Sequence, residues 1–213
     1  VVMLSLGIGM NESYERQLKQ MGSLNVITVN RYYWPENSGS GGYSQPINST
    51  LDDKAVLSFS KIEGVEAFTP VMEIYPKFVS GKYVGSASLV GVDVRTMEAF
   101  DFKVAQGTLP QEGDPDAVVF GCNAAIYFYN PKSRGDIYYW DPNRESPIDP
   151  MTDKVQITFD WSYGERRPIG QSSGETNNRP AKLYKLKVVG MLEQSNDEKD
   201  YSVYMDINQV KKL

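Results

Sequence analysis

The chain has 213 residues, of which 40% are hydrophobic and 23% charged, enough to bury a core as one large domain or two small ones. Lys and Arg number 22 against 27 Asp and Glu, and no basic run interleaves with aromatic residues, so a nucleic-acid partner is disfavoured. The chain has no histidine, which excludes Ser-His-Asp and Cys-His catalytic sets and His-containing zinc sites within it. Cys122 is the single cysteine, so an internal disulfide is excluded as well.

The N-terminal segment is uncharged and apolar over Val1–Met10. Such a run is about half of the roughly 20 residues that cross a bilayer, and it lacks the basic leader and cleavage site of a signal peptide. Apolar residues continue at helical spacing and predict a helix from Val2 to Met21, ended by Gly22. We interpret this helix as the outer end of a membrane segment. An ordinary first amphipathic helix of a soluble domain is the alternative.

The next segments predict a strand, a loop and a second helix. Leu24–Val29 is rich in β-branched residues and is expected to form a strand. Residues 32–49 collect Gly, Pro, Ser and Asn and predict a loop. Thr50 followed by Asp53 approximates a capping box, and the apolar spacing behind it predicts a helix over Leu51–Ile62.

The middle of the chain predicts a compact α+β arrangement. Val65–Tyr75 alternates as a long strand that Pro70 breaks or places at an edge, and it is expected to form a hairpin with Ser86–Val92 through a turn at Ser80–Lys82. We expect a short helix over Thr96–Phe100, a buried strand over Asp116–Phe120 and a helix over Ala124–Tyr129. Repetition of strand, helix and strand favours an α+β fold with split βαβ units.

The stretch 130–181 differs in composition from its surroundings. It is rich in proline and holds the strand-like run Lys154–Phe159 and the aromatic group Tyr138-Tyr139-Trp140. We predict a β-rich inserted subdomain packed beside the main sheet. The expected organisation is therefore a helix over residues 1–22, an α+β core over 23–129 and 182–213, and an insertion over 130–181. The core closes with strand-like runs at Leu183–Leu192 and Tyr201–Ile207.

The order of these parts resembles the periplasmic core domain of MacB-like and FtsX-like ABC transporter permeases. Each matching piece is short and weak alone, but together they occur in the family's order. The pieces are Gly22–Val29, Ile62–Pro70, Leu89–Asp93, Gly107–Pro110, Ala117–Gly121, Tyr184–Leu192 and Val203–Ile207. The resemblance covers residues 1–129 and 182–213 and leaves the insertion unmatched.

The resemblance implies a role in transport. In that family the domain lies outside the cytoplasmic membrane between two transmembrane helices, and the permease works as a dimer with a cytoplasmic ATP-binding subunit or domain. The implied function is to couple ATP-driven motion to substrate export or release, and an extracytoplasmic partner protein is a further candidate partner. No Gly-rich phosphate loop ending in Gly-Lys-Ser or Gly-Lys-Thr is present in this chain, so an ATP site must lie elsewhere. The resemblance implies no catalytic residue, cofactor or metal here.

Two other functions stay open on the sequence. A ligand- or partner-sensing ectodomain would use aromatic side chains as contact anchors, and the candidates are Tyr138, Tyr139, Trp140, Trp161 and Tyr163. A secreted carbohydrate-active protein is the other alternative, because acidic residues surround the aromatic group, at Asp136, Asp141, Glu145, Asp149 and Asp153. No spacing fixes two of these carboxylates across a glycosidic bond, so solvated loop acids are the simpler interpretation.

Overall fold

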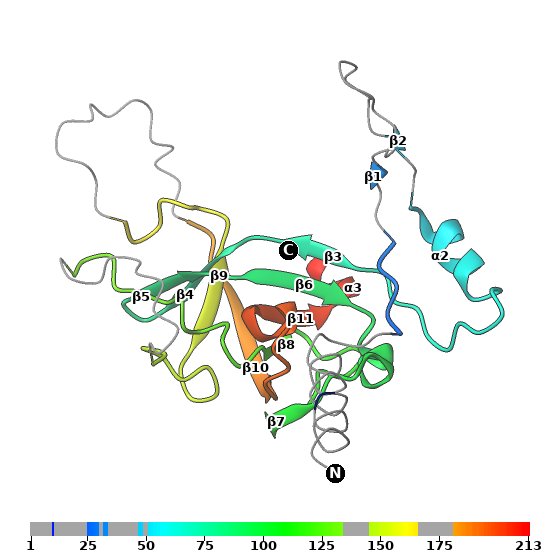
Figure 1. The fold of residues 1–213 in the computed structure, drawn as a ribbon. Coiled ribbons are helices and arrows are strands. Elements are labelled where there is room, and N and C mark those ends of the chain that lie inside the picture. The colour runs from blue at the N-terminus through cyan, green and yellow to red at the C-terminus, as the bar shows by residue number, and fades with distance from the viewer. Residues whose placement is uncertain are drawn as a thin grey trace, which may run out of the picture.

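A single mixed sheet organises the molecule (Figure 1). The computed structural model describes residues 10, 25–29, 32–33, 47–48, 51–133, 145–165 and 181–213. The nine-stranded sheet has the order β3-β6-β11-β8-β10-β9-β4-β5, and β7 pairs with β10 beside that path. Its strands are β3 (Met72–Ile74), β4 (Lys77–Ser80), β5 (Tyr83–Ser86), β6 (Ser88–Val92), β7 (Val104–Gly107), β8 (Ala117–Phe120), β9 (Val155–Thr158), β10 (Tyr184–Leu192) and β11 (Ser202–Asp206).

Helices are few and short among the described residues. They are α2 (Asp53–Phe59), α3 (Ile207–Val210) and the 3₁₀ helices η1 (Val94–Thr96), η2 (Glu98–Phe100) and η3 (Glu198–Tyr201). A separate pair of short strands, β1 (Tyr32–Tyr33) and β2 (Ile47–Asn48), forms a two-stranded sheet. The fold is thus α+β with a low helix content, and its α+β class is confirmed.

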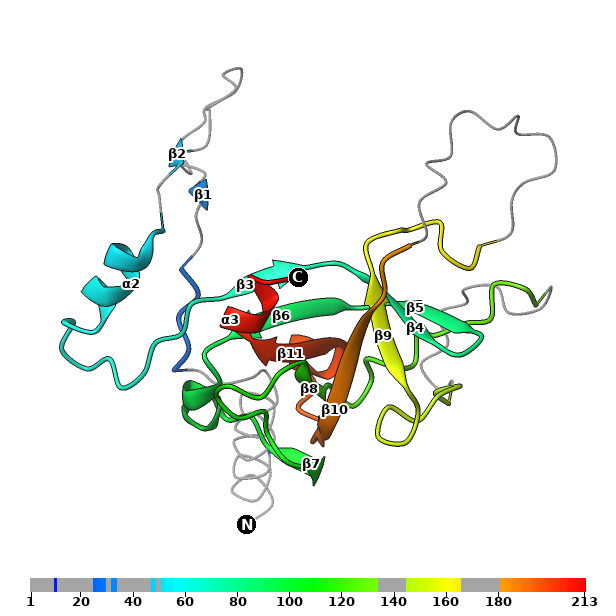
Figure 2. The same cartoon turned by 180° about the vertical axis from the view of Figure 1, so that it is seen from behind.

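The long strand β10 joins the two parts of the sheet. Its first half pairs antiparallel with β9, and its second half pairs parallel with β8 and antiparallel with β7. A second parallel pair is formed by β6 and β11, in register from Ser88 and Ser202 to Val92 and Asp206. Parallel neighbours in a sheet require crossover connections, so strands that pair here come from distant parts of the sequence. Figure 2 shows β10 crossing from the β8 side to β9.

Alternate residues of the central strands build a core on each face of the sheet. In β8, Val118 and Phe120 belong to the larger cluster with Phe78, whereas Val119 belongs to a second cluster with Met97. The same alternation holds in β11, because successive side chains of a strand point to opposite faces. The larger cluster includes Phe128 and Val210, and η1 and Met97 cover the second one. Both faces are therefore buried, as expected for the apolar run of Asp116–Phe120.

The predicted strands and the observed ones agree best at the centre of the sheet. The predicted strands over Asp116–Phe120, Lys154–Phe159 and Leu183–Leu192 are found as β8, β9 and β10. The run Tyr201–Ile207 contains β11, but its first residue ends η3 and its last begins α3.

Three predictions nearer the N-terminus are wrong or need correction. The strand over Leu24–Val29 is absent over its described part, since Asn25–Val29 has no regular secondary structure. Of Val65–Tyr75 only β3 is a strand. It does pair with β6 as expected, but the hairpin β4–β5 intervenes, and the turn at Gly81 belongs to that hairpin. Pro70 and the short partner strand leave the preceding residues without a ladder.

The helix predictions were less accurate. The helix over Leu51–Ile62 is shortened to α2, and its N-cap is Asp52, whose side chain accepts a hydrogen bond from the Ala55 N–H, so the Thr50–Asp53 box is incorrect. The short helix over Thr96–Phe100 is instead a pair of 3₁₀ helices. Ala124–Tyr129 forms turns that end in a bridge between Tyr129 and Val84. The N–H groups of Ala124, Ile126 and Phe128 bond to carbonyl oxygens three residues back instead of four, and Phe128 packs in the larger core cluster.

The N-terminal helix lies outside the described residues, apart from Met10, which is helical. In the described part of the chain no helix combines the length and apolar character needed to cross a bilayer. Strand β9, from the predicted insertion, lies between β10 and β4 within the main sheet. The division into a core and an insertion stays a proposal.

Candidate functional site

The aromatic candidates divide between described and undescribed parts of the chain. Trp161 and Tyr163 lie in the turn that follows β9, whereas Tyr138, Tyr139 and Trp140 lie outside the described residues. Trp161 is 54% exposed and Tyr163 is half-buried. Of the predicted contact residues, Trp161 is thus the one whose described side chain is open to a partner.

The turn that carries Trp161 is held by its own hydrogen bonds. The Asp160 carboxylate accepts from the Ser162 N–H at 2.9 Å and from the Ser162 hydroxyl at 2.6 Å. These bonds, the hydroxyl's first, stabilise the ionised form and lower the pKa of Asp160. The Tyr163 N–H donates to the Asp160 carbonyl oxygen at 3.1 Å, which closes the turn. Trp161 therefore projects from a defined backbone.

A buried lysine also forms hydrogen bonds to this turn. Lys77, at the start of β4, is only 3% exposed, and its Nζ donates to Glu165 Oε1 at 2.6 Å and to the Trp161 carbonyl oxygen at 3.0 Å. The hydroxyl of Tyr129 donates to the same carboxylate oxygen. A buried ammonium requires such partners because desolvation alone is costly. Lys77 thereby ties β4, the Trp161 turn and the segment at Tyr129 together.

The charges in this network shift two pKa values. Burial raises the pKa of Glu165, but hydrogen bonds from Lys77 and Tyr129 outweigh it, so that the pKa lies below its ordinary value. Burial and the neighbouring Glu165 carboxylate raise the pKa of Tyr129 to about 12. Glu165 is therefore ionised and Tyr129 neutral at physiological pH. Neither group is poised to exchange a proton near neutrality, so the network is suited to holding the turn.

A second aromatic group lies at the start of β10. The Phe159 and Tyr184 rings meet edge to face, with centroids 6.0 Å apart, and Lys182 Nζ lies 4.4 Å from the centroid of the Tyr184 ring. Phe159 is exposed and Tyr184 packs against the larger core cluster. The two sequence neighbours of Asp160, Phe159 and Trp161, thus both have exposed aromatic side chains.

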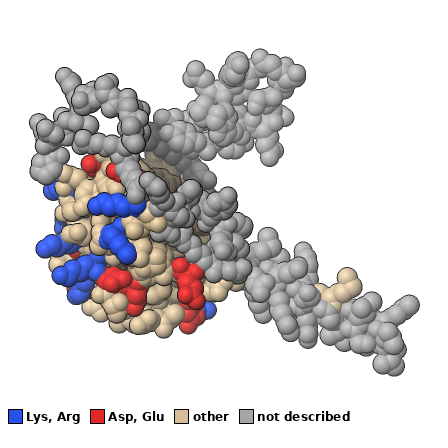
Figure 3. Space-filling model, turned by 90° about the vertical axis from the view of Figure 1, so that its left-hand side faces the viewer, with Lys and Arg blue, Asp and Glu red and all other residues tan. Residues whose placement is uncertain are grey.

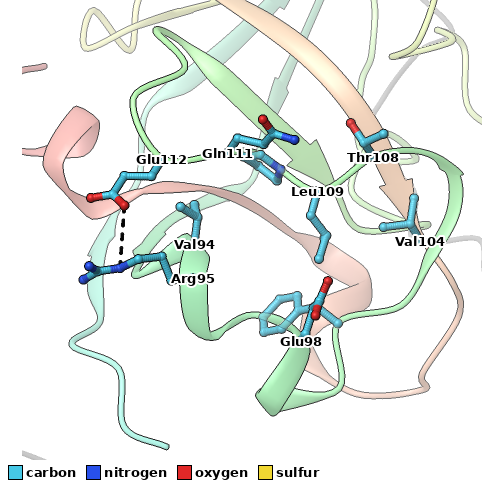
Figure 4. Close-up of a pocket in the computed structure, with 10 residues that line it drawn as sticks. Val94, Arg95, Glu98, Val104, Thr108, Leu109, Gln111 and Glu112 are labelled. Atoms are coloured by element: carbon cyan, nitrogen blue, oxygen red, sulfur yellow. Dashed lines mark ion pairs between the residues drawn. The ribbon is translucent and has the colours of Figure 1, made fainter.

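A shallow pocket of about 630 Å³ lies between η1, η2 and the segment that follows β7 (Figure 4). Its floor is apolar, with Val94, Phe102 and Leu109, and its rim is polar. Arg95 on the rim pairs with Asp93 through Nε at 2.9 Å and Nη2 at 2.7 Å, and its Nε lies 3.9 Å from Glu112 Oε2. The Arg95 guanidinium lowers the pKa of Asp93. Because Arg95 is already paired, this pocket offers no free cation to an anionic ligand.

A larger hollow of about 780 Å³ lies on the other side of Arg95. Its walls are α2, the segment before β3 and the 3₁₀ helices, and they include Leu57, Phe68 and Ala99. Apolar side chains dominate this lining, as in many ligand pockets, and two of its charged side chains, Asp93 and Arg95, are paired with each other.

Cys122 and Asp200 are two neighbouring titratable groups in the described part of the chain. Cys122 is half-buried, and burial, with Asp200 beside it, raises the pKa of its thiol to about 11, so it is a poor nucleophile. Asp200 accepts hydrogen bonds from the N–H groups of Ser195 and Asn196 at 2.8 Å each and so fixes their loop. Within the described ranges, no three or more acidic or cysteine side chains gather where a metal ion could bind.

The acidic series of the carbohydrate alternative is only partly described. Asp136 and Asp141 lie outside the described residues. Asp149 and Asp153 share one turn, in which the Asp149 N–H donates to Asp153 Oδ2 at 3.0 Å. The Asp149 carboxylate in turn accepts from the Met151 N–H at 3.0 Å and the Thr152 hydroxyl at 3.0 Å. Both carboxylates therefore form hydrogen bonds within their own loop. This agrees with the simpler interpretation that they are acidic loop residues.

Sequence reasoning missed the residues that organise the site. Lys77 follows Pro76 in an ordinary-looking strand, and nothing local indicates that the face opposite Phe78 is also buried. For Arg95 and Asp93 the sequence gives only a weak indication of pairing, namely an acidic and a basic residue two positions apart. The surface itself agrees with the charge balance, since Figure 3 shows basic and acidic side chains close together on the face it presents. That face shows no unbroken basic surface among the described residues, as phosphate binding would need.

Comparison with known proteins gives the family. No curated protein matches the chain significantly. The extracellular domain of the noncanonic ABC-type transporter YknZ from Gram-positive bacteria is 12% identical, with 75% of this chain and 64% of that one covered at a TM-score of 0.46. The periplasmic region of MacB from Actinobacillus actinomycetemcomitans is 16% identical, with 76% and 57% covered at a TM-score of 0.46. The chain thus spans less than two thirds of either structure. Since the model of the MacB-like periplasmic core domain matches residues 1–213, the chain belongs to that family of extracytoplasmic domains of ABC-type transporters.

Proposed function

We propose that this domain couples ATP-driven motion of an ABC transporter permease to the export or release of a substrate outside the membrane. The observation that carries the proposal is the family match over residues 1–213. The proposal includes a dimeric permease, with two copies of this chain or one copy and a related chain. It also includes transmembrane helices flanking the domain and a cytoplasmic ATP-binding subunit or domain as the source of motion.

The attachment of the C-terminal segment supports this role. Strand β11 lies between β6 and β8 and is paired on both sides. The following helix α3 packs on β6, where a Cβ on Gly91 would lie only 3.0 Å from Val210 Cγ2, and Leu213 packs against the larger core cluster. A displacement applied to this segment is therefore transmitted to the centre of the sheet. Packed cores resist gradual deformation, so the sheet is expected to move as one body.

Spin-label distances in the intact transporter test the proposal. Lys185 is exposed on β10, a regular strand, and a Lys185→Cys variant in a Cys122→Ala background carries one label in each copy of this chain. We expect the distance between the labels of a homodimer to change between the nucleotide-free state and the state with a non-hydrolysable ATP analogue. An unchanged distance distribution would contradict coupling. The Cys122→Ala protein alone is the labelling control.

The exposed Trp161 on its fixed turn favours a second candidate, a ligand- or partner-sensing ectodomain. A large aromatic side chain on a turn whose backbone is already fixed needs little backbone ordering when a partner covers it. In the same labelled protein, sensing predicts a distance change on addition of extracytoplasmic extract at constant nucleotide, and a loss of that change in Trp161→Ala. A response to nucleotide alone would favour the transport role instead.

A further inference from the structure

Three exposed lysines lie together on two neighbouring strands of the sheet. Lys185 and Lys187 belong to β10, and Lys154 immediately precedes β9. The two strands lie side by side and pair antiparallel, with Leu186 opposite Val155 (Figure 2). One position beyond that pair, the same register brings Lys187 opposite Lys154, and Lys185 lies two residues away on the same side. We call Lys154, Lys185 and Lys187 the lysine strip.

The lysine strip lies on the face of the sheet that carries the second core cluster. Leu186 and Val155 belong to the larger cluster, and successive side chains of a strand point to opposite faces, so the lysines point the other way. The same face is buried on both sides of the strip, at Val79 of β4 and at Ala117 of β8, which is opposite Lys187. The exposed part of this face is therefore narrow and follows the first half of β10.

The ammonium groups of the lysine strip have no partner in the described part of the chain. The ion pairs found there use other cations, namely Lys77, Arg95, Lys103 and Lys199. Like charges directly opposite each other on neighbouring strands destabilise a sheet. Lysine often protects the edge of a sheet from pairing, but β9 and β10 are both interior strands. In a chain with a net charge of −5, this local positive charge is suited to an anionic partner.

The spacing of the lysines fits an extended acidic segment. Alternate residues of a strand lie about 6.6–6.8 Å apart, so Lys185 and Lys187 match alternate side chains of an extended chain that lies along β10. A single phosphate group is usually held by donors that converge on it, including backbone N–H groups. Here β10 is paired on both sides, so its backbone groups are used in the sheet.

We propose that the lysine strip binds an extended segment of a partner protein in which acidic residues alternate with uncharged ones. The segment lies along the first half of β10, with carboxylates beside Lys185 and Lys187 and with Lys154 contributing from β9. Gln156, which is opposite Lys185 and partly exposed, offers its amide to the same segment. This inference does not depend on the proposed function.

Titration with an acidic peptide tests the proposal on the whole chain, with backbone amide chemical shifts as the readout. The probe is a peptide of about eight residues in which Glu and Thr alternate, because Thr favours extended backbone. At about 50 mM salt we expect shifts in β9 and β10. Binding to Lys185→Glu/Lys187→Glu should be at least about tenfold weaker, because attraction is replaced by repulsion at two positions.

A matched variant controls for net charge. Lys61→Glu/Lys211→Glu makes the same change in charge at exposed lysines elsewhere and should bind the peptide as the unsubstituted protein does. Equal binding to the two double variants, or no binding to the unsubstituted protein, would overturn the proposal.

Two further probes test the kind of partner. A peptide of the same composition with its glutamates contiguous should bind about threefold more weakly, because fewer of its carboxylates match the lysines. Equal binding of the two peptides would overturn the extended segment. Vesicles that contain an anionic lipid should not compete with the alternating peptide. Lysine-dependent binding to vesicles, without binding to the peptide, would show a membrane surface instead and overturn the proposal.

Lys154→Glu separates binding from stability. It places opposite charges across from each other at positions 154 and 187, so it should raise the thermal unfolding midpoint by about 2 °C while it weakens peptide binding. A lower midpoint together with weaker binding would contradict the proposal, because lost stability would then explain the lost binding. The label distances in the intact transporter are measured without any peptide, so failure of peptide binding and failure of coupling are distinguishable.

Discussion

At the scale of single residues, Lys77 is the residue that most directly holds the turn carrying Trp161. Its ammonium is buried, yet it reaches the exposed side chain of Glu165, which is 39% accessible, and the Trp161 carbonyl oxygen. Removing one member of a buried pair usually costs several kcal/mol because the other is left without a partner. Here water can reach Glu165, so the cost is expected to be smaller.

We therefore predict that Lys77→Ala lowers the free energy of unfolding by about 2 kcal/mol, measured by urea denaturation. Lys77→Met keeps most of the buried stem and is expected to lose about half as much. Lys154→Met, at an exposed lysine, is the matched control and should change stability by less than about 0.5 kcal/mol. A loss in Lys77→Ala no larger than this control would contradict the role assigned to the buried pair.

The lowered pKa of Glu165 makes the same network sensitive to acid. A carboxyl whose pKa is lower in the folded state stabilises the fold above its unfolded pKa, and this contribution is lost as pH falls through the folded value. The stability difference between the wild type and Glu165→Gln should thus be constant between about pH 6 and about pH 8. It should shrink below the ordinary pKa of 4.5. Denaturation curves at several pH values measure it, and a difference that grows on acidification would refute the assignment.

At the scale of elements, the pairing of β7 with β10 depends on a close approach of the two backbones. Gly107 has a φ of +81°, and a Cβ there would lie 2.2 Å from the Val189 carbonyl oxygen. That oxygen accepts the Thr108 N–H at 2.9 Å, so a side chain at residue 107 would disrupt the bond that holds β7 in place. Gly190, its partner in the ladder, is similarly crowded. The glycine of the short resemblance motif Gly107–Pro110 is thus explained by this close packing.

A pair of glycine variants separates this crowding from backbone strain. Gly113 has a φ of +88° but open space around it. Gly113→Ala should cost about 1–2 kcal/mol of unfolding free energy from the left-handed conformation alone. Gly107→Ala should cost at least about 3 kcal/mol and should speed hydrogen exchange in β7, because the strands must also separate. Equal losses in both variants would show that the close approach is not required.

At the scale of the whole molecule, the sheet combines the predicted core and the predicted insertion. Strand β9 lies between β10 and β4, and it supplies Val155 and Ile157 to the larger core cluster. The hairpin β4–β5 therefore reaches the rest of the sheet through β9. A segment that is inserted in the sequence can still unfold together with the rest of the protein.

Deletions test this integration. Replacing residues 145–165 by a Gly-Ser linker removes β9 and should abolish the cooperative unfolding transition or lower its midpoint by more than 10 °C, as roughly expected for a loss of several kcal/mol. Replacing residues 166–180 removes no described strand and should cost about 1 kcal/mol or less. Circular dichroism during heating measures both. A stable, cooperative protein without residues 145–165 would show that the insertion is an independent unit.

The sequence by itself determined the central strands, because an uninterrupted apolar run such as Ala117–Phe120 can be buried only between two layers. It also determined the family, since the order of short motifs survives even where each motif is weak. It excluded histidine chemistry outright. These are properties of residue type and order, which need no knowledge of distant contacts.

Only the tertiary structure decided which polar residues are buried and which strand-like segments pair. The burial of Lys77 depends on Glu165 and Tyr129, far along the chain, and so does the position of Trp161. Asn25–Val29 and Ala124–Tyr129 have the local character of regular elements, but neither forms one among the described residues. A strand exists only when a neighbour accepts its hydrogen bonds, and a short helix persists only when packing favours it, so both depend on residues that local patterns do not include.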